Sequence, residues 1–196
     1  IQLSNVDANI SINEVALWLV NKTGESTINN QSLILSVMVR MGSDLQQIEA
    51  IFPGSDEWMP YREALTKIND AESWKNDKEG KRKVRSFIKD SLKTKELRNK
   101  PTILYCKAEN IRNAWSWLQD TQISNEGLSF GERDKPLFEE FKNLRVIRLR
   151  NDETPEYFAI DGEKISGFVT GLFKKENNDR VFYSLGNKSA QMTGQN

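Results

Sequence analysis

Histidine is absent from the 196-residue sequence, and cysteine occurs once, as Cys106. The lack of histidine excludes Ser-His and Cys-His nucleophile pairs and every His-ligated zinc site. One cysteine cannot form a disulfide framework or a cysteine-based zinc site, and it fits a reducing compartment, so we expect a cytoplasmic protein. The eleven glycines are scattered singly, which excludes a glycine-rich phosphate loop. Carboxylate-metal chemistry and plain binding are the classes that remain.

Long hydrophobic runs are also missing. No apolar stretch approaches the roughly 18 residues that a membrane span needs, and no signal peptide is visible, so we expect no membrane partner. The sequence begins at Ile1 rather than Met. We therefore expect one domain, residues 1–196, from a longer protein whose other domains are its partners. Its ends, residues 1–13 and 186–196, are expected to be frayed.

Net charge is zero, with 28 basic and 28 acidic residues, but the charges are unevenly placed. Residues 1–74 carry four basic and ten acidic side chains, a net charge of −6. Residues 75–100 carry eleven basic and four acidic side chains, a net charge of +7. Such a block creates a local positive field that attracts phosphates, although a solvated helix face is the plainer interpretation.

Hydrophobic periodicity predicts both strands and helices. Three apolar runs with short polar connections predict an antiparallel meander, and we expect Trp18 and Leu104 to share one core. Three- and four-residue spacing then predicts helices, one of them basic and ended by Pro101. The expected strands are 14–22, 32–41, 45–52, 102–106, 144–150, 156–160, 167–173 and 180–185. The expected helices are 57–69, 81–97 and 109–118.

The resulting order, β-β-β-α-β-α-β, predicts an α/β protein with a mixed sheet flanked by helices, which is the order of the RNase H-like fold. The segment KPTILYCKAENIRNAWSWLQD at 100–120 resembles the RNase H-like domain of prokaryotic PIWI proteins, most closely the Argonaute-related PIWI-RE group. Similar stretches are LRVIRLRNDETPEYFA at 144–159, RVFYSLGNKSAQMTG at 180–194 and WMPYREALTKI at 58–68. The resemblance implies a nucleic-acid platform, which in active members cleaves a strand with two metal ions held by carboxylates.

The carboxylates that the resemblance requires are incomplete here. Where the resemblance implies an acid, the first strand has Asn21 next to its end, and the strand at 102–106 is followed by Lys107. A lysine occupies the place of a cation and repels it, and an asparagine brings no negative charge. Glu109 and Glu63 are the nearest substitutes. We therefore expect no metal site and no cofactor; Mg²⁺ or Mn²⁺ enters only if the protein is an active nuclease.

The candidate contacts to nucleic acid are basic and polar side chains near Lys107, on the expected helix at 81–97 and on the expected strand at 144–150. They are Lys81, Arg82, Lys83, Arg85, Lys107, Asn110, Arg112, Arg148 and Arg150. Plainer roles stay open for several: Asn110 as a helix cap, Arg112 as the partner of Asp120 or Glu109, and Lys107 as a solvated strand end. For the pair Trp115 and Trp117, we expect one core and one surface residue rather than a platform for bases.

We therefore expect a PIWI-type RNase H-like domain that binds an RNA, DNA or hybrid duplex through its backbone without cutting it. Two alternatives remain at this point. One is an active metal-dependent nuclease that uses displaced carboxylates such as Glu109. The other is a protein-interaction module without a role in nucleic-acid binding.

Overall fold

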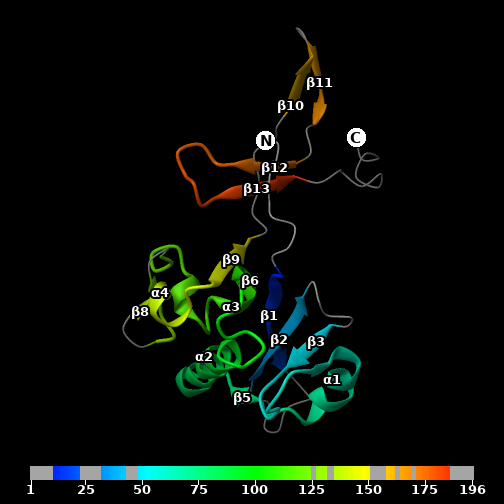
Figure 1. Ribbon diagram of the computed structural model, residues 1–196, viewed down its shortest axis with the longest axis vertical. Coiled ribbons are helices and arrows are strands. Elements are labelled where there is room, and N and C mark those ends of the chain that lie inside the picture. Colours follow the sequence, from blue (N-terminus) through cyan, green and yellow to red (C-terminus); the bar gives the residue numbers. More distant parts are fainter. Residues whose placement is uncertain are drawn as a thin grey trace. The chain divides into compact units, whose positions relative to one another are not determined.

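The computed structural model describes residues 11–22, 32–42, 48–124, 127–131, 135–150, 158–161, 164–168 and 171–185. The chain forms two compact units, residues 1–150 and 151–196, and each is described by itself (Figure 1). Of the ends expected to be frayed, residues 1–10 and 186–196 lie outside the described residues. Asn13 does not fit that expectation, because it begins the first strand and is buried.

A mixed sheet organises the first unit, and its strand order is β4-β3-β2-β1-β6-β9, with β5 paired to β2. The predicted meander is confirmed, because β1–β2 and β2–β3 are antiparallel. The strands β6 and β9 continue the sheet in the direction of β1, in parallel pairings. The bounds are β1 Asn13–Lys22, β2 Leu33–Gly42, β3 Glu49–Ile51, β4 Met59–Pro60, β5 Trp74–Lys75, β6 Thr102–Lys107 and β9 Leu144–Leu149.

One face of the sheet packs against α2 (Lys78–Leu92) and α3 (Ala108–Ile111). Its core contains Leu17 and Leu104 from the sheet, Val84 and Ile88 from α2, and Trp115, all fully or almost fully buried. We call this the first face. The apolar stripe at three- and four-residue spacing is what turns α2 toward the strands, because residues that far apart share one side of a helix.

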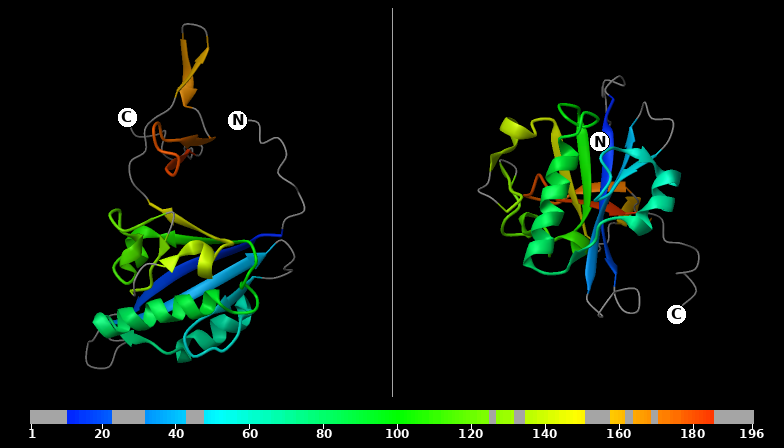
Figure 2. Two further views of the ribbon diagram at one scale, coloured as in Figure 1. Left: turned by 60° about the vertical axis from the view of Figure 1, so that its left-hand side comes forward. Right: turned by 90° about the horizontal axis from the view of Figure 1, so that it is seen from below.

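The opposite, second face is covered over β2 and β3 by α1 (Tyr61–Lys67) and the 3-10 turn Ile68–Asp70. Ala64 of α1 packs there with Leu35, Val37 and Phe52 in a separate cluster. Figure 2 shows α1 and α2 on opposite sides of the strands. The sheet is therefore the middle of three layers, with helices on both of its faces.

The expectation that Trp18 lies in the core with Leu104 is wrong. The strand β1 alternates strictly, so Asn13, Val15, Leu17 and Leu19 point into the first face while Trp18 points to the second. Trp18 is 48% exposed, whereas Leu104 is fully buried. The continuous apolar run hid this alternation, because both faces of the strand carry hydrophobic side chains.

All three predicted helices are shorter than expected. The basic helix ends at Leu92 rather than 97, because the Thr94 hydroxyl bonds to the Ser91 carbonyl and accepts the Trp58 indole N–H, which fixes a turn instead. The helix expected at 109–118 consists of α3 and a 3-10 turn, Ser116–Leu118. The helix expected at 57–69 begins only at Tyr61, after Pro60.

The tryptophan pair differs from the expectation as well. Trp115 and Trp117 are both buried, and their rings stack at 5.5 Å between centroids. The Trp115 indole N–H donates to the Ser129 carbonyl at 2.6 Å. Both rings thus belong to the core, which leaves neither for a base.

Smaller elements complete the described part of the chain. The first unit also has β7 (Gly127–Leu128) paired with β8 (Lys135–Pro136), followed by α4 (Leu137–Glu140). The second unit contains two antiparallel hairpins, β10 (Phe158–Asp161) with β11 (Lys164–Phe168), and β12 (Gly171–Lys174) with β13 (Phe182–Leu185). The single strand expected at 167–173 is therefore wrong, because that range is divided between two hairpins. Among the described residues, no helix is long and apolar enough to cross a membrane.

Candidate nucleic-acid interface

Three predicted contact residues gather at the carboxyl ends of β6 and β9. Arg148 of β9 and Arg150, which directly follows that strand, point to one side, as the period of two predicts, and both reach Asp120. Arg112 follows α3 and adds its positive charge to the surroundings of the same carboxylate. We call Arg112, Arg148 and Arg150 the arginine cluster. Among the described residues, Asp120 is the carboxylate that lies among these three guanidinium groups.

The contacts within the cluster differ in strength. Arg148 Nη1 lies 2.5 Å from Asp120 Oδ1, and the Nη1 of Arg150 lies 3.3 Å from the same oxygen. The hydrogen bond from Arg148, followed by its charge, lowers the pKa of Asp120 below its ordinary value, and the charges of Arg150 and Arg112 act in the same direction. Asp120 therefore stays ionised at neutral pH while being 64% exposed.

Arg148 also has a structural role. Its Nη1 donates to the carbonyl of Leu118 at 2.8 Å, and its side chain is only 19% exposed. It thereby ties the turn after α3 to β9. Arg112 and Arg150 are exposed, so these two present their charge to solvent.

The predicted cations of α2 fall on different sides of the helix. The N-terminal end of α2 follows β5, which pairs with the start of β2 beside the end of β1. Arg82 pairs with Glu79, and Lys83 pairs with Glu72 at 3.4 Å. Lys81 is half-buried and lies one turn before Arg85, on the same side of the helix.

Arg85 contacts the protein itself. Its Nε donates to the Phe130 carbonyl at 2.9 Å, and its Nη1 donates to the Ala114 carbonyl at 2.8 Å. Burial lowers the pKa of the guanidinium, although an arginine remains charged at any physiological pH. Arg85 thus holds two loops against α2, and the side of α2 that carries Lys81 faces the segment that follows Arg112.

Asn110 forms a clamp on β1 rather than a cap. Its Oδ1 accepts the backbone N–H of Leu19 at 2.7 Å, and its Nδ2 donates to the carbonyl of Leu19 at 2.8 Å. Both ends of the amide are therefore used. The alternative that Asn110 caps α3 is wrong, because Lys107 is the capping residue and makes no side-chain cap bond.

Lys107 lies on the other side of the sheet from the arginine cluster. In the β6–β9 pairing Lys107 faces Leu149, whereas Arg148 faces the buried Cys106. The Lys107 ammonium lies 5.8 Å from the centroid of the Trp18 ring. The predicted contact set is thus divided between the two faces of the sheet.

The carboxylates named as substitutes for metal ligands do not converge. Glu63 pairs with Lys67 on α1, over the second face, while Glu109 lies on α3, over the first. Asn21 is exposed on β1. Within the part of the chain that the structure describes, no group of three or more histidine, cysteine, aspartate or glutamate side chains could hold a metal ion. These residues do not fit a two-metal centre, which needs several convergent carboxylate oxygens.

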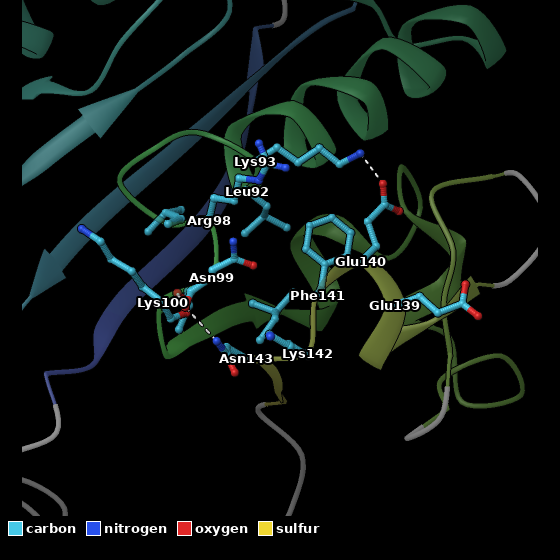
Figure 3. Close-up of a pocket in the computed structure, with 13 residues that line it drawn as sticks. Leu92, Lys93, Arg98, Asn99, Lys100, Glu139, Glu140, Phe141, Lys142 and Asn143 are labelled. Atoms are coloured by element: carbon cyan, nitrogen blue, oxygen red, sulfur yellow. Dashed lines mark hydrogen bonds and ion pairs between the residues drawn. The ribbon is translucent and has the colours of Figure 1, made fainter.

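A cavity of about 320 Å³ lies at the opposite end of the sheet, where β6 and β9 begin. Figure 3 shows the Lys93–Glu140 ion pair beside Phe141, and the hydrogen bond from Asn143 to the Asn99 carbonyl. Further cations, Arg98, Lys100 and Lys142, stand around it. The predicted contact residues do not line this cavity, so its cations serve as a comparison for the arginine cluster.

Comparison of the sequence with known proteins identifies a family. A family model described as the RNaseH domain of pPIWI_RE matches residues 14–196. Neither the curated proteins nor the solved structures gave a match. The match spans nearly the whole chain and agrees with the mixed sheet flanked by helices. The chain therefore belongs to the family of RNase H domains of pPIWI_RE proteins.

Proposed function

We propose that this domain binds the backbone of a nucleic-acid duplex through the arginine cluster and does not cut it. The observation that carries the proposal is the set of three guanidinium groups around the carboxylate of Asp120. Guanidinium groups recognise phosphates through two parallel hydrogen bonds, and they stay charged at all relevant pH values. The cluster lies at the carboxyl ends of parallel strands, where ligands of open α/β sheets commonly bind.

Lys81 extends this basic edge from the side of α2, beyond Arg85. Arg85 and Asn110 are left out of the contact set, because their hydrogen-bonding groups already hold backbone carbonyls and amides. Contacts to phosphate carry no sequence information, so the proposed binding is independent of base sequence. The proposed absence of cleavage rests on Lys107 and Asn21, which stand where the resemblance to active PIWI domains implies acids.

The test is a salt titration of binding to a labelled 20-base-pair duplex, with Arg112→Ala/Arg150→Ala compared with the whole unmodified chain. Each phosphate contact contributes about 0.9 to the slope of log K against log salt on B-form DNA, so the double variant should lower the slope by about 1.8. Arg98→Ala/Lys100→Ala removes the same charge at the opposite end of the sheet and should leave the slope nearer the unmodified value.

Two outcomes would contradict the proposal. If both double variants reduce affinity and slope equally, the binding is a non-specific effect of net charge rather than of the arginine cluster. If incubation of the duplex with Mg²⁺ or Mn²⁺ gives cleavage that Glu109→Gln abolishes, the protein is the nuclease of the alternative interpretation. Neither Arg112 nor Arg150 is buried, so loss of folding is not expected from the first variant.

A further inference from the structure

Half of the second face is open. Among the described residues of the first unit, α1 covers β2 and β3. The part of the face formed by β1, β6 and β9 presents large side chains to solvent. Trp18 is 48% exposed, Leu149 47% and Ile147 39%. Large exposed apolar patches on a sheet usually mark a binding surface. We call Trp18, Tyr105, Lys107, Arg145, Ile147 and Leu149 the open face.

The pairing of the strands sets these side chains in rows. Ala16 of β1 pairs with Tyr105, which pairs with Ile147 of β9. One row further along, Lys107 pairs with Leu149 and stands beside Trp18. Trp18 follows Ala16, the partner of Tyr105, as the next residue of β1 on this face, and successive residues on one face lie about 7 Å apart along a strand.

The chemistry of the open face combines rings with cations. The Lys107 ammonium lies 5.8 Å from the Trp18 ring centroid, and the exposed Arg145 marks the opposite corner. Arg145 uses one nitrogen, Nη1, for the carbonyls of Lys142 and Leu144, and its guanidinium has further donors. Glu14 is the carboxylate of these rows among the described residues, and burial followed by the negative charge of Glu14 raises the pKa of the Tyr105 hydroxyl.

We propose that the open face binds single-stranded nucleic acid, with bases stacked on Trp18 and Tyr105 and phosphates held by Lys107 and Arg145. Exposed rings beside cations on a sheet are the recurring platform for single strands, because every base has a face that can stack. This site is separate from the arginine cluster, which engages a duplex through its backbone alone. An apolar helix is the rival occupant, but it would remove the charges of Lys107, Arg145 and Glu14 from water without supplying polar partners for them.

The experiment measures anisotropy of labelled 15-nucleotide strands bound to the whole chain. One strand is oligo-dT, and the other is an abasic strand of the same length and phosphate count. Base stacking contributes roughly 1–3 kcal/mol per base, so Trp18→Ala should weaken oligo-dT binding by about fivefold to more than a hundredfold. Trp18→Phe keeps a ring and should retain most of the affinity.

The matched control is Leu65→Ala, which truncates an equally exposed apolar residue on α1 and should leave oligo-dT binding unchanged. The abasic strand should bind weakly and show no response to Trp18→Ala. The proposal is overturned if the abasic strand binds as tightly as oligo-dT, or if Trp18→Ala has no effect. Tight binding of an amphipathic helical peptide that Trp18→Ala abolishes, with no oligo-dT binding, would assign the face to the rival occupant.

The two proposals fail separately. Loss of oligo-dT binding in Trp18→Ala, with duplex binding unaffected by Arg112→Ala/Arg150→Ala, would support the open face and reject the arginine cluster. The opposite pattern, a duplex that depends on the arginines and a single strand that ignores Trp18, would reject only the open face.

Discussion

At the scale of single residues, Cys106 shows how the sheet changes the chemistry of a side chain. It is fully buried in β6, and burial raises the pKa of its thiol from 9.0 to about 12. A thiol in the unfolded chain ionises near its ordinary pKa, whereas the thiol in the folded protein stays protonated. The stability of the fold should therefore fall as the pH rises above 9, by about 1.4 kcal/mol per pH unit from this group alone.

Urea unfolding at pH 7 and pH 10 tests this expectation, with Cys106→Ala as the control for all other titrating groups. Raising the pH from 7 to 10 should lower the unfolding free energy of the wild type by about 1.4 kcal/mol more than that of Cys106→Ala. Parallel pH profiles for both proteins would show that the thiol is not held in its neutral form.

Asn110 shows why residue roles are hard to predict from sequence. The sequence places an asparagine near a helix start, where its usual role is to cap the helix by accepting a hydrogen bond from a backbone N–H. Its partner is instead Leu19, 91 residues earlier. Contacts over that separation depend on the parallel pairing of β1 with β6. Likewise, the pairing of Arg148 and Arg150 with Asp120 needs the turn after α3 to return beside β9, whereas Arg112, for which Asp120 was an expected partner, acts on it only through its charge.

At the scale of elements, the start of α2 depends on a capping carboxylate and on a glycine. The Asp77 carboxylate accepts the N–H of Gly80 at 2.8 Å and caps the helix. A Cβ at Gly80 would lie 1.9 Å from the Lys75 carbonyl oxygen, because the helix begins directly against β5. A glycine inside a helix normally lowers stability, but here the close approach of two backbones requires it.

Substitutions at these two positions should therefore act in unequal ways. Asp77→Ala removes the cap and should cost about 1 kcal/mol of unfolding free energy. Gly80→Ala should cost more than that, although alanine is the better helix former by about 1 kcal/mol, because the backbone must move. Chemical denaturation of both variants measures the two costs. A Gly80→Ala protein as stable as the wild type would show that α2 does not approach β5 so closely.

The lengths of the helices were less predictable than their existence. Periodicity identified the apolar stripe of α2 correctly, but the helix ends where Thr94 and Trp58 form a tertiary hydrogen bond. Leu97 continues the apolar spacing and is buried, so the sequence pattern runs on through a turn that is not helical. A pattern of burial does not by itself distinguish a helix from a turn that buries the same side chains.

At the scale of the whole molecule, the strand order followed from the sequence better than the faces of the sheet did. Three strands with short connections predicted the meander, and the order of strands and helices predicted a mixed sheet. Which side chains face which layer was not determined, because β1 and β2 are apolar on both faces. This is why Trp18 was expected inside, and why Lys107 was grouped with arginines that lie on the other face.

The most direct test of the arginine cluster is a gain of binding. Asp120→Asn removes the carboxylate that the described part of the chain places among the three arginines, and it leaves an exposed amide there. A unit charge at about 4 Å in water is worth about 1 kcal/mol, so affinity for the duplex should rise about fivefold at low salt, with a steeper salt dependence. Destabilisation of the fold cannot produce an increase of this kind. Unchanged or weaker duplex binding by Asp120→Asn, in a protein that still unfolds cooperatively, would contradict the account.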